Sequence, residues 1–176
     1  MVEIIPAILT DSSGKFKELV RKLEPYASRI HIDIADGEFV PNKTVAGYNE
    51  LREIESAVKF DIHLMVKRPQ DQLKKWFYSH ADRFIIHIES EINPEEIIGS
   101  IKEHGRKVGL AMNPETNIEK VEKYLNDIDF IQFMTVHPGF QGGDFVESVL
   151  GKVQEFNKKF PNVPIAVDGS MHVETA

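Results

Sequence analysis

Residues 30–42 read IHIDIADGEFVPN, an apolar strand pattern that runs into a loop. Because successive side chains of a strand alternate between its two faces, His31 and Asp33 point to one face and the isoleucines to the other. Two further segments have a similar form: residues 60–66 read FDIHLMV, and residues 165–170 read IAVDGS. Together they place two histidines and two aspartates at strand ends, a candidate set of metal ligands: His31, Asp33, His63 and Asp168.

The composition is that of a globular protein. Of the 176 residues, 41% are hydrophobic and 28% charged, so we expect one soluble domain over residues 1–176. The formal net charge of −7 gives no support to nucleic acid or an anionic membrane as a partner. The absence of cysteine excludes disulfides, thiolate metal sites and cysteine nucleophiles. No segment has the ~20 apolar residues of a membrane span or the pattern of a signal peptide, so we expect a cytoplasmic protein.

Short apolar runs alternate with helical patterns along the chain. Their valine, isoleucine and phenylalanine content predicts seven strands, near residues 3–9, 29–34, 59–64, 83–88, 107–112, 130–136 and 164–168. Apolar residues at helical spacing predict helices between them, around residues 16–23, 73–77, 97–101, 118–125 and 146–156. The pairs Asn93-Pro94 and Asn113-Pro114, each followed by an acidic residue, are typical of helix N-termini.

This alternation predicts a parallel sheet, because parallel neighbours need crossover connections. A doubly wound open sheet would place a site at a switch point of the strand order, whereas a (β/α)8 barrel brings the carboxyl ends of many strands to one mouth. Polar residues stand at the ends of well-separated strands, from His31 and His63 to Asp168. That spacing favours the barrel.

Several segments together resemble the ribulose-phosphate 3-epimerase family, which includes relatives acting on hexulose 6-phosphates. The segments are PAIL at 6–9, HID at 31–33, DGEFVPN at 36–42, HLMV at 63–66, NPET at 113–116, MTVHPGF at 134–140 and VDG at 167–169. The resemblance implies that His31, Asp33, His63 and Asp168 bind a divalent metal ion. Zinc, iron(II), manganese and cobalt all suit two nitrogen and two oxygen ligands.

The reaction implied by the resemblance inverts C3 of a ketose phosphate, with D-ribulose 5-phosphate to D-xylulose 5-phosphate as the first expectation. The C3 hydrogen is α to the carbonyl, so its removal builds negative charge that a metal ion can stabilise as an enediolate. Inversion needs one base on each face of the planar intermediate, a role that falls to Asp33 and Asp168. Two alternatives stay open: a hexulose-6-phosphate 3-epimerase, and a non-catalytic relative that binds sugar phosphate or metal.

The substrate phosphate is expected at residues 138–143, which read PGFQGG, because glycines let the main chain approach an anion. The full set of expected substrate-binding residues is Met65, Met134, Pro138, Gly139, Phe140, Gln141, Gly142, Gly143, Gly169 and Ser170. The two methionines would form apolar walls beside the metal. His87 and Glu89 belong to another predicted strand. They are either supports of the site or polar residues of a strand edge, and the second interpretation is preferred.

The sequence departs from the family pattern at several points. Ala7 stands where the family usually has serine, and Ala35 where it usually has methionine, whereas Ser170 and residues 67–71 resemble the hexulose-phosphate branch. After residues 171–176 the family would continue through a helix, an eighth strand and a closing helix. We therefore expect about seven βα units with the eighth strand and last helix missing, and exposed edges at the seam unless copies of the chain associate into a homo-oligomer.

Overall fold

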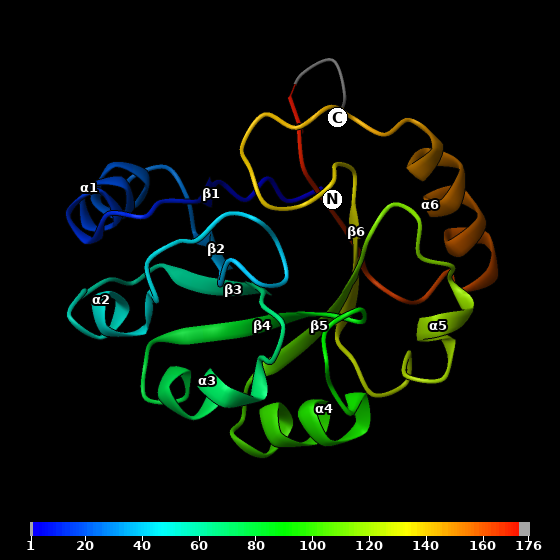
Figure 1. The fold of residues 1–176 in the computed structure, drawn as a ribbon, viewed down its shortest axis with the longest axis horizontal. Coiled ribbons are helices and arrows are strands. Elements are labelled where there is room, and N and C mark those ends of the chain that lie inside the picture. The colour runs from blue at the N-terminus through cyan, green and yellow to red at the C-terminus, as the bar shows by residue number, and fades with distance from the viewer. Residues whose placement is uncertain (1, 173–176) are drawn as a thin grey trace.

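The structure of the protein is a computed structural model that describes residues 2–172. Strands and helices alternate throughout this range (Figure 1). The strands are β1 (Ala7–Ile8), β2 (Arg29–Ala35), β3 (Lys59–Met65), β4 (Ala81–His87), β5 (Lys107–Met112), β6 (Phe130–Met134) and β7 (Ile165–Asp168). The helices are α1 (Ser13–Leu23), α2 (Tyr48–Arg52), α3 (Gln70–Trp76), α4 (Pro94–Glu103), α5 (Glu119–Glu122) and α6 (Ser148–Lys159).

The seven strands form one parallel sheet in the order of the sequence, with the helices outside it (Figure 1). The sheet curves strongly, as the contacts of Asp168 on β7 with residues of β2 and β3 show. Its Oδ2 lies 3.4 Å from Nε2 of His31 and 3.2 Å from Nδ1 of His63. In a flat sheet β2 and β7 would be five spacings apart, about 24 Å at ~4.8 Å each. The fold is therefore of the (β/α)8 barrel type, and the described residues supply seven of its strands.

The two outer strands have one neighbour each. Among residues 2–172, β1 pairs with β2 alone and β7 with β6 alone. β7 is correspondingly less buried than the central strands, and its Val167 is 39% exposed. The apolar side chains of Val2 and Ile4, which precede β1, are also exposed.

The alternation of side chains along β2 separates the core from the site. Ile30, Ile32 and Ile34 are buried in the main hydrophobic cluster, which lies between the sheet and the surrounding helices. On the opposite face, His31 and Asp33 point into the barrel. A smaller apolar cluster inside the barrel is built from Ile85, Ala111, Phe130 and Ala166.

Helix termini follow their capping signals in part. α1 begins after Ser12, whose side chain accepts a hydrogen bond from the Lys15 N–H, as expected of an N-cap residue. α4 begins at Pro94 after Asn93, as predicted. The predicted helix start at Asn113-Pro114 is wrong, because these residues form a turn and α5 begins at Glu119.

Other differences from the sequence prediction lie at the first strand and the second helix. The strand expected over residues 3–9 is reduced to Ala7–Ile8, because the residues before Pro6 have no apolar face against the core. The helix α2 was not predicted: it has five residues and buries only Leu51, too short for a periodic pattern. The remaining strands start and end within two residues of their predicted bounds.

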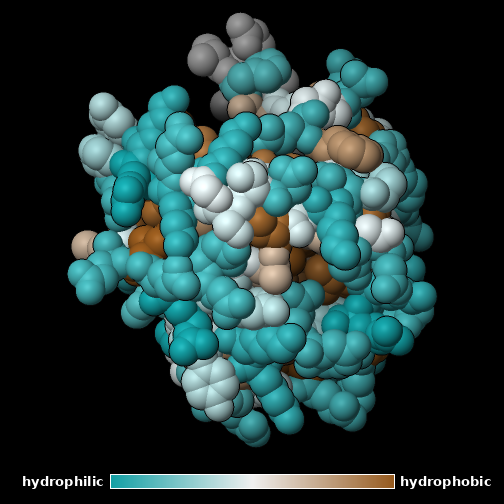
Figure 2. Space-filling model, turned by 60° about the vertical axis from the view of Figure 1, so that its left-hand side comes forward, coloured by the Kyte–Doolittle hydropathy of each residue, from teal (hydrophilic) through white to brown (hydrophobic). Residues whose placement is uncertain are grey.

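The surface is mostly hydrophilic. The face in Figure 2 is covered by hydrophilic side chains, and hydrophobic ones show mainly in a hollow near its centre. Within residues 2–172, every helix is too short or too polar to cross a membrane.

Candidate metal centre

The structure brings together the four residues that the sequence singled out as metal ligands. His31 and Asp33 lie on β2, His63 lies on β3, and Asp168 is the last residue of β7. Each offers one ligand atom, and these four atoms lie within 4.8 Å of one another. Nδ1 of His63 is 2.9 Å from Oδ1 of Asp33, and Nε2 of His31 is 3.2 Å from the same oxygen.

The residues fit a divalent cation. The His63 side chain is fully buried, and the side chains of His31, Asp33 and Asp168 are 8%, 12% and 20% exposed. Nε2 of His31 is buried beside oxygens of Asp33 and Asp168, at 3.2 and 3.4 Å, but makes no hydrogen bond of good geometry to either, a costly state that coordination of a cation would relieve. Two imidazole nitrogens and two carboxylate oxygens are a donor set that zinc and other first-row divalent ions accept.

The pKa values within the cluster reflect its buried negative charge. Burial lowers the pKa of His31, but the charges of Asp33 and Asp168 outweigh burial and raise it well above its ordinary value. The pKa of His63 is likewise raised, because hydrogen bonds to both aspartates outweigh burial. Burial raises the pKa of Asp168, yet His31 and His63 hold it well below its ordinary value, and that of Asp33 is also lowered. The two carboxylates therefore attract positive charge to this point.

His87 belongs to the same site, so the interpretation of it as a strand-edge residue is wrong. Its side chain is fully buried at the end of β4, and its Nε2 is 2.9 Å from Nε2 of His63. Nδ1 of His87 is 3.2 Å from Oε2 of Glu89. The two-residue spacing of His87 and Glu89 repeats that of His31 and Asp33, and this repetition is the sequence signal that could have identified them.

Gln132 is a further polar residue of the site that the sequence analysis missed. It lies in the middle of β6 and is 2% exposed, and its Nε2 donates to Oδ2 of Asp168 at 2.9 Å. A glutamine inside the apolar run FIQFM was the available signal. The amide fixes the carboxylate of Asp168 from the neighbouring strand.

The predicted apolar walls lie next to the cluster. Met65 and Met134 are the last residues of β3 and β6, and both are 3% exposed. Met134 stands opposite Asp168 in the strand register. Met65 stands opposite Ala35. Both methionines are therefore at the same end of the sheet as the four candidate ligands.

The loop expected to bind phosphate is at this end as well. Residues 138–143 follow β6 and lie beside residues 169 and 170, where Ser170 Oγ donates a hydrogen bond to the Gly143 carbonyl. Gly139 and Gly169 have φ values of +125° and +113°, which residues other than glycine rarely adopt. A Cβ on Gly169 would also lie 2.4 Å from Val136. Phe140 at the loop tip is 60% exposed.

Thr135, the residue after β6, connects the start of this loop to the end of β7 by hydrogen bonds. Its N–H donates to the Asp168 carbonyl at 2.8 Å, and its hydroxyl lies within hydrogen-bonding distance of the Asp168 and Gly169 carbonyls. The main-chain carbonyls of Asp168 and Gly169 are thus positioned by the same residue.

The match to known proteins covers the chain. Residues 3–176 match the family described as the ribulose-phosphate 3 epimerase family. The chain belongs to this family. It is 33% identical to the ribulose-phosphate 3-epimerase of Bacillus subtilis, over 100% of this chain and 84% of the relative. It is 36% identical to the cytoplasmic isoform of Oryza sativa subsp. japonica, and 36% identical to the enzyme of Chlamydia trachomatis, over 98% and 99% of this chain and 78% of each relative.

As a member of this epimerase family, the chain is an isomerase that acts on carbohydrates. Both alanines that depart from the usual family residues lie beside the site. Ala7 stands opposite His31 in the register of β1 and β2, and Ala35 stands opposite Met65.

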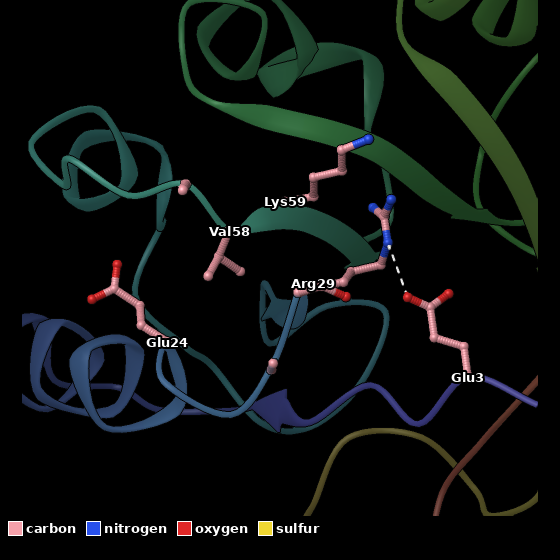
Figure 3. A pocket seen from close by; sticks show the side chains of 8 residues that line it. Glu3, Glu24, Arg29, Val58 and Lys59 are labelled. Atoms are coloured by element: carbon pink, nitrogen blue, oxygen red, sulfur yellow. Dashed lines mark ion pairs between the residues drawn. The ribbon is translucent and has the colours of Figure 1, made fainter.

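A separate pocket of about 520 Å³ lies at the opposite end of the strands (Figure 3). It is lined by the first residues of β2 and β3, Arg29 and Lys59, and by Glu3 and Glu24. The Arg29 guanidinium is engaged by Asp61 and Asp82, with Glu3 at 3.9 Å. The positive charge of Arg29 is therefore paired with carboxylates of the fold itself.

Proposed function

We propose that this epimerase inverts C3 of D-ribulose 5-phosphate to give D-xylulose 5-phosphate, with Asp33 and Asp168 as the two proton carriers. The observation that supports this assignment is the position of two carboxylates from distant strands, β2 and β7, on the same pair of imidazoles. An inversion requires one proton carrier on each face of the substrate carbon, and carboxylates from two distant strands can approach it from two sides.

The proposed reaction begins with one aspartate ionised and the other protonated by solvent, which is the less populated form because the pKa values of both carboxyl groups are lowered in the cluster. The ionised carboxylate takes the proton from C3, and the bonding electrons of that C–H bond move toward the C2 carbonyl oxygen. The protonated aspartate then gives its proton to the opposite face of C3, and the carbonyl re-forms. The first aspartate then releases to solvent the proton that it took, and the second takes a proton from solvent, which restores the starting state for the next turnover.

The other residues of the site bind and orient. A divalent ion held by His31, Asp33, His63 and Asp168 would supply positive charge for the carbonyl oxygen, and zinc, iron(II), manganese and cobalt all match these ligands. Met65 and Met134 would exclude water from C3. The main-chain N–H groups of residues 138–143, together with Gly169 and Ser170, would hold the phosphate.

A pentulose phosphate is proposed ahead of a hexulose phosphate. The sequence feature that pointed to the hexulose branch near the site is Ser170. Its hydroxyl donates to the Gly143 carbonyl and holds the loop in place. A serine with this structural role gives no preference for the longer sugar.

The test is deuterium incorporation at C3 of ribulose 5-phosphate, followed by NMR in heavy water with manganese or zinc present. We expect xylulose 5-phosphate that carries solvent deuterium at C3, and a loss of about 10²–10⁴-fold in Asp33→Asn and in Asp168→Asn. Asp82→Asn, a change at the opposite end of the barrel, is the matched control and should exchange as the parent does.

Bound metal is measured for every variant, so that loss of an acid/base group is separated from loss of the ion. A folded, metal-loaded parent without exchange would contradict the proposal and favour a binding-only relative. Faster turnover of a hexulose 6-phosphate in the same assay would move the substrate assignment to that branch.

A further inference from the structure

A line of buried hydrogen bonds leads away from the metal cluster through β4. It starts at Nε2 of His63, 2.9 Å from Nε2 of His87, and continues from Nδ1 of His87 to Oε2 of Glu89 at 3.2 Å. Oε1 of Glu89 accepts from the Asn113 N–H at 2.9 Å and from the Thr116 hydroxyl. Both histidine side chains are fully buried, so no solvent replaces these contacts.

The donors and acceptors of this line are determined by its two ends. At the inner end, Nδ1 of His63 faces Asp33 and Asp168, so a cation bound there takes the Nδ1 lone pair and leaves the ring proton on Nε2. His87 must then accept at its Nε2, and its own proton is on Nδ1. At the outer end, an ionised Glu89 has acceptors only, which suits a proton on Nδ1 of His87.

The groups around the two histidines are compatible with hydrogen bonds that are donated from His63 to His87 and from His87 to Glu89. Nε2 of Gln132 also lies 3.4 Å from Nε2 of His63, but its shorter hydrogen bond, at 2.9 Å, goes to Asp168. The Nε2 proton of His63 therefore has His87 as its acceptor. The ring of Phe39 packs on His87 with centroids 4.8 Å apart and holds it against His63.

The turn that supplies the outer donors is itself fixed. Nζ of Lys152, on α6, donates to the Thr116 carbonyl at 2.8 Å and to the Pro114 carbonyl. This contact holds residues 113–116 as a turn over Glu89 and away from the start of α5. The line thus ends in a rigid part of the molecule.

We propose that His87 and Glu89 are positioning residues that hold His63 in the tautomer whose Nδ1 lone pair faces the metal cluster. The proposal rests on the metal site of the proposed function. It adds His87, the last residue of β4, and Glu89, in the turn after β4, as residues that tune the affinity of that site. Partners of this kind orient a ligating imidazole, and their removal typically costs about 10–100-fold in metal affinity.

The first test is the affinity for Zn²⁺ and Co²⁺, measured by competition with a chromophoric chelator on protein stripped of metal. We expect His87→Leu to bind about 10–100-fold more weakly, because the His63 N–H loses its acceptor. His87→Gln should stay within about threefold of the parent, since the amide oxygen accepts from His63 and the amide N–H donates to Glu89. Glu89→Gln should bind the metal ion more weakly. Its NH2 group would face one of the three groups that donate to Glu89, which are Nδ1–H of His87, the Asn113 N–H and the Thr116 hydroxyl.

Matched controls are His80→Leu, an exposed histidine at the amino end of β4, and Glu91→Gln, an exposed carboxylate two residues after Glu89. Both should bind as the parent does. The visible spectrum of bound Co²⁺ gives a second readout, which should change in His87→Leu and be restored in His87→Gln.

A second test needs no variant. Nitrogen-15 spectra of labelled histidine in the Zn²⁺-loaded protein should show the proton of His63 on Nε2 and that of His87 on Nδ1. A proton on Nε2 of His87, or parent-like affinity in both His87→Leu and Glu89→Gln, would overturn the inference while leaving the proposed function in place. A parent that binds neither ion would overturn the metal site and the inference together.

Discussion

At the scale of single residues, Asp36 connects two loops that border the site. Oδ1 accepts from the N–H groups of Glu38 and Phe39, each at 2.8 Å, and Oδ2 accepts from the Lys67 N–H at 2.7 Å. Burial raises the pKa of Asp36, but these backbone hydrogen bonds outweigh it and lower the pKa. The loops that follow β2 and β3 are therefore joined by one carboxylate.

The variant Asp36→Asn tests this connection. The amide keeps an oxygen for Glu38 and Phe39 but turns an NH2 group toward the Lys67 N–H, so the free energy of unfolding at pH 7 should fall by about 1–3 kcal/mol. Because the folded-state pKa is lowered, the contribution of Asp36 is present above its unfolded pKa and is lost as pH falls, from about pH 5 downward. Urea unfolding from pH 7 down to about pH 2.5, through the unfolded and the lowered folded-state pKa of Asp36, measures the loss and its pH dependence. A difference between variant and parent that stays constant over this range would contradict the assignment.

At the scale of elements, an ion-pair network joins the amino ends of the neighbouring strands β2, β3 and β4. Asp61 is 2% exposed and pairs with Arg29 and with Nε of Arg83 at 2.7 Å. Asp82 also pairs with Arg29, at 2.9 Å, but its side chain is 31% exposed. The buried aspartate holds the strands together at the end of the barrel opposite the site.

Replacement of each aspartate by alanine should separate the two contributions. Asp61→Ala leaves two arginines without their buried partner, and we expect the free energy of unfolding to fall by about 3–5 kcal/mol. Asp82→Ala, the control, should cost at most about 1 kcal/mol because the pair is partly exposed. Equal losses in chemical denaturation would show that burial of Asp61 does not set its contribution.

Close packing between β5 and β6 gives another prediction at this scale. A Cβ on Gly109 would lie 2.5 Å from the ring of Phe130 inside the barrel. Gly109→Ala should therefore lower the free energy of unfolding by about 1–3 kcal/mol, and Phe130→Leu in the same chain should recover part of this loss. Gly99→Ala on α4, where a Cβ would contact nothing within 4 Å, should instead stabilise by about 0.5–1 kcal/mol. Thermal and urea unfolding measure all three changes, and a neutral Gly109→Ala would contradict the packing argument.

At the scale of the whole molecule, the four candidate ligands link distant parts of the sheet. Three come from β2 and β3, and the fourth, Asp168, comes from β7 at the other edge of the sheet. A cation bound by all four would therefore join the sheet across the barrel interior, because it would bind the folded state and leave the unfolded chain unbound.

The expected consequence is a rise in thermal stability on addition of zinc. At a concentration of 100 times the dissociation constant, the ion contributes about 2.7 kcal/mol. For a chain of this size that raises the midpoint of unfolding by about 5–10 °C. A thermal scan with and without Zn²⁺ measures the shift, which a chelator should reverse and Asp168→Asn should reduce. Unchanged midpoints at saturating zinc would contradict a four-ligand site that includes β7.

Most of the strands, and the position of His31 and Asp33 on one face of β2, follow from the local sequence pattern. These two residues are two positions apart, and the alternation of a strand is a local property of the backbone. It places the apolar residues of β2 in the core and its polar residues in the barrel, whatever the rest of the chain does. Family motifs pointed to the four candidate ligands and to the loop at 138–143 as parts of one site.

Which of these residues come into contact depends on the packing of the barrel. Contact of Asp168 with His31, and of His63 with His87, depends on the register of strands far apart in sequence and on the curvature of the sheet. The turn at 113–116 replaces a predicted helix start because its donors are taken by Glu89, another contact with no local signal. Short-range periodicity fixes the direction of a side chain, but the distance between strands is set by the packing of the whole barrel.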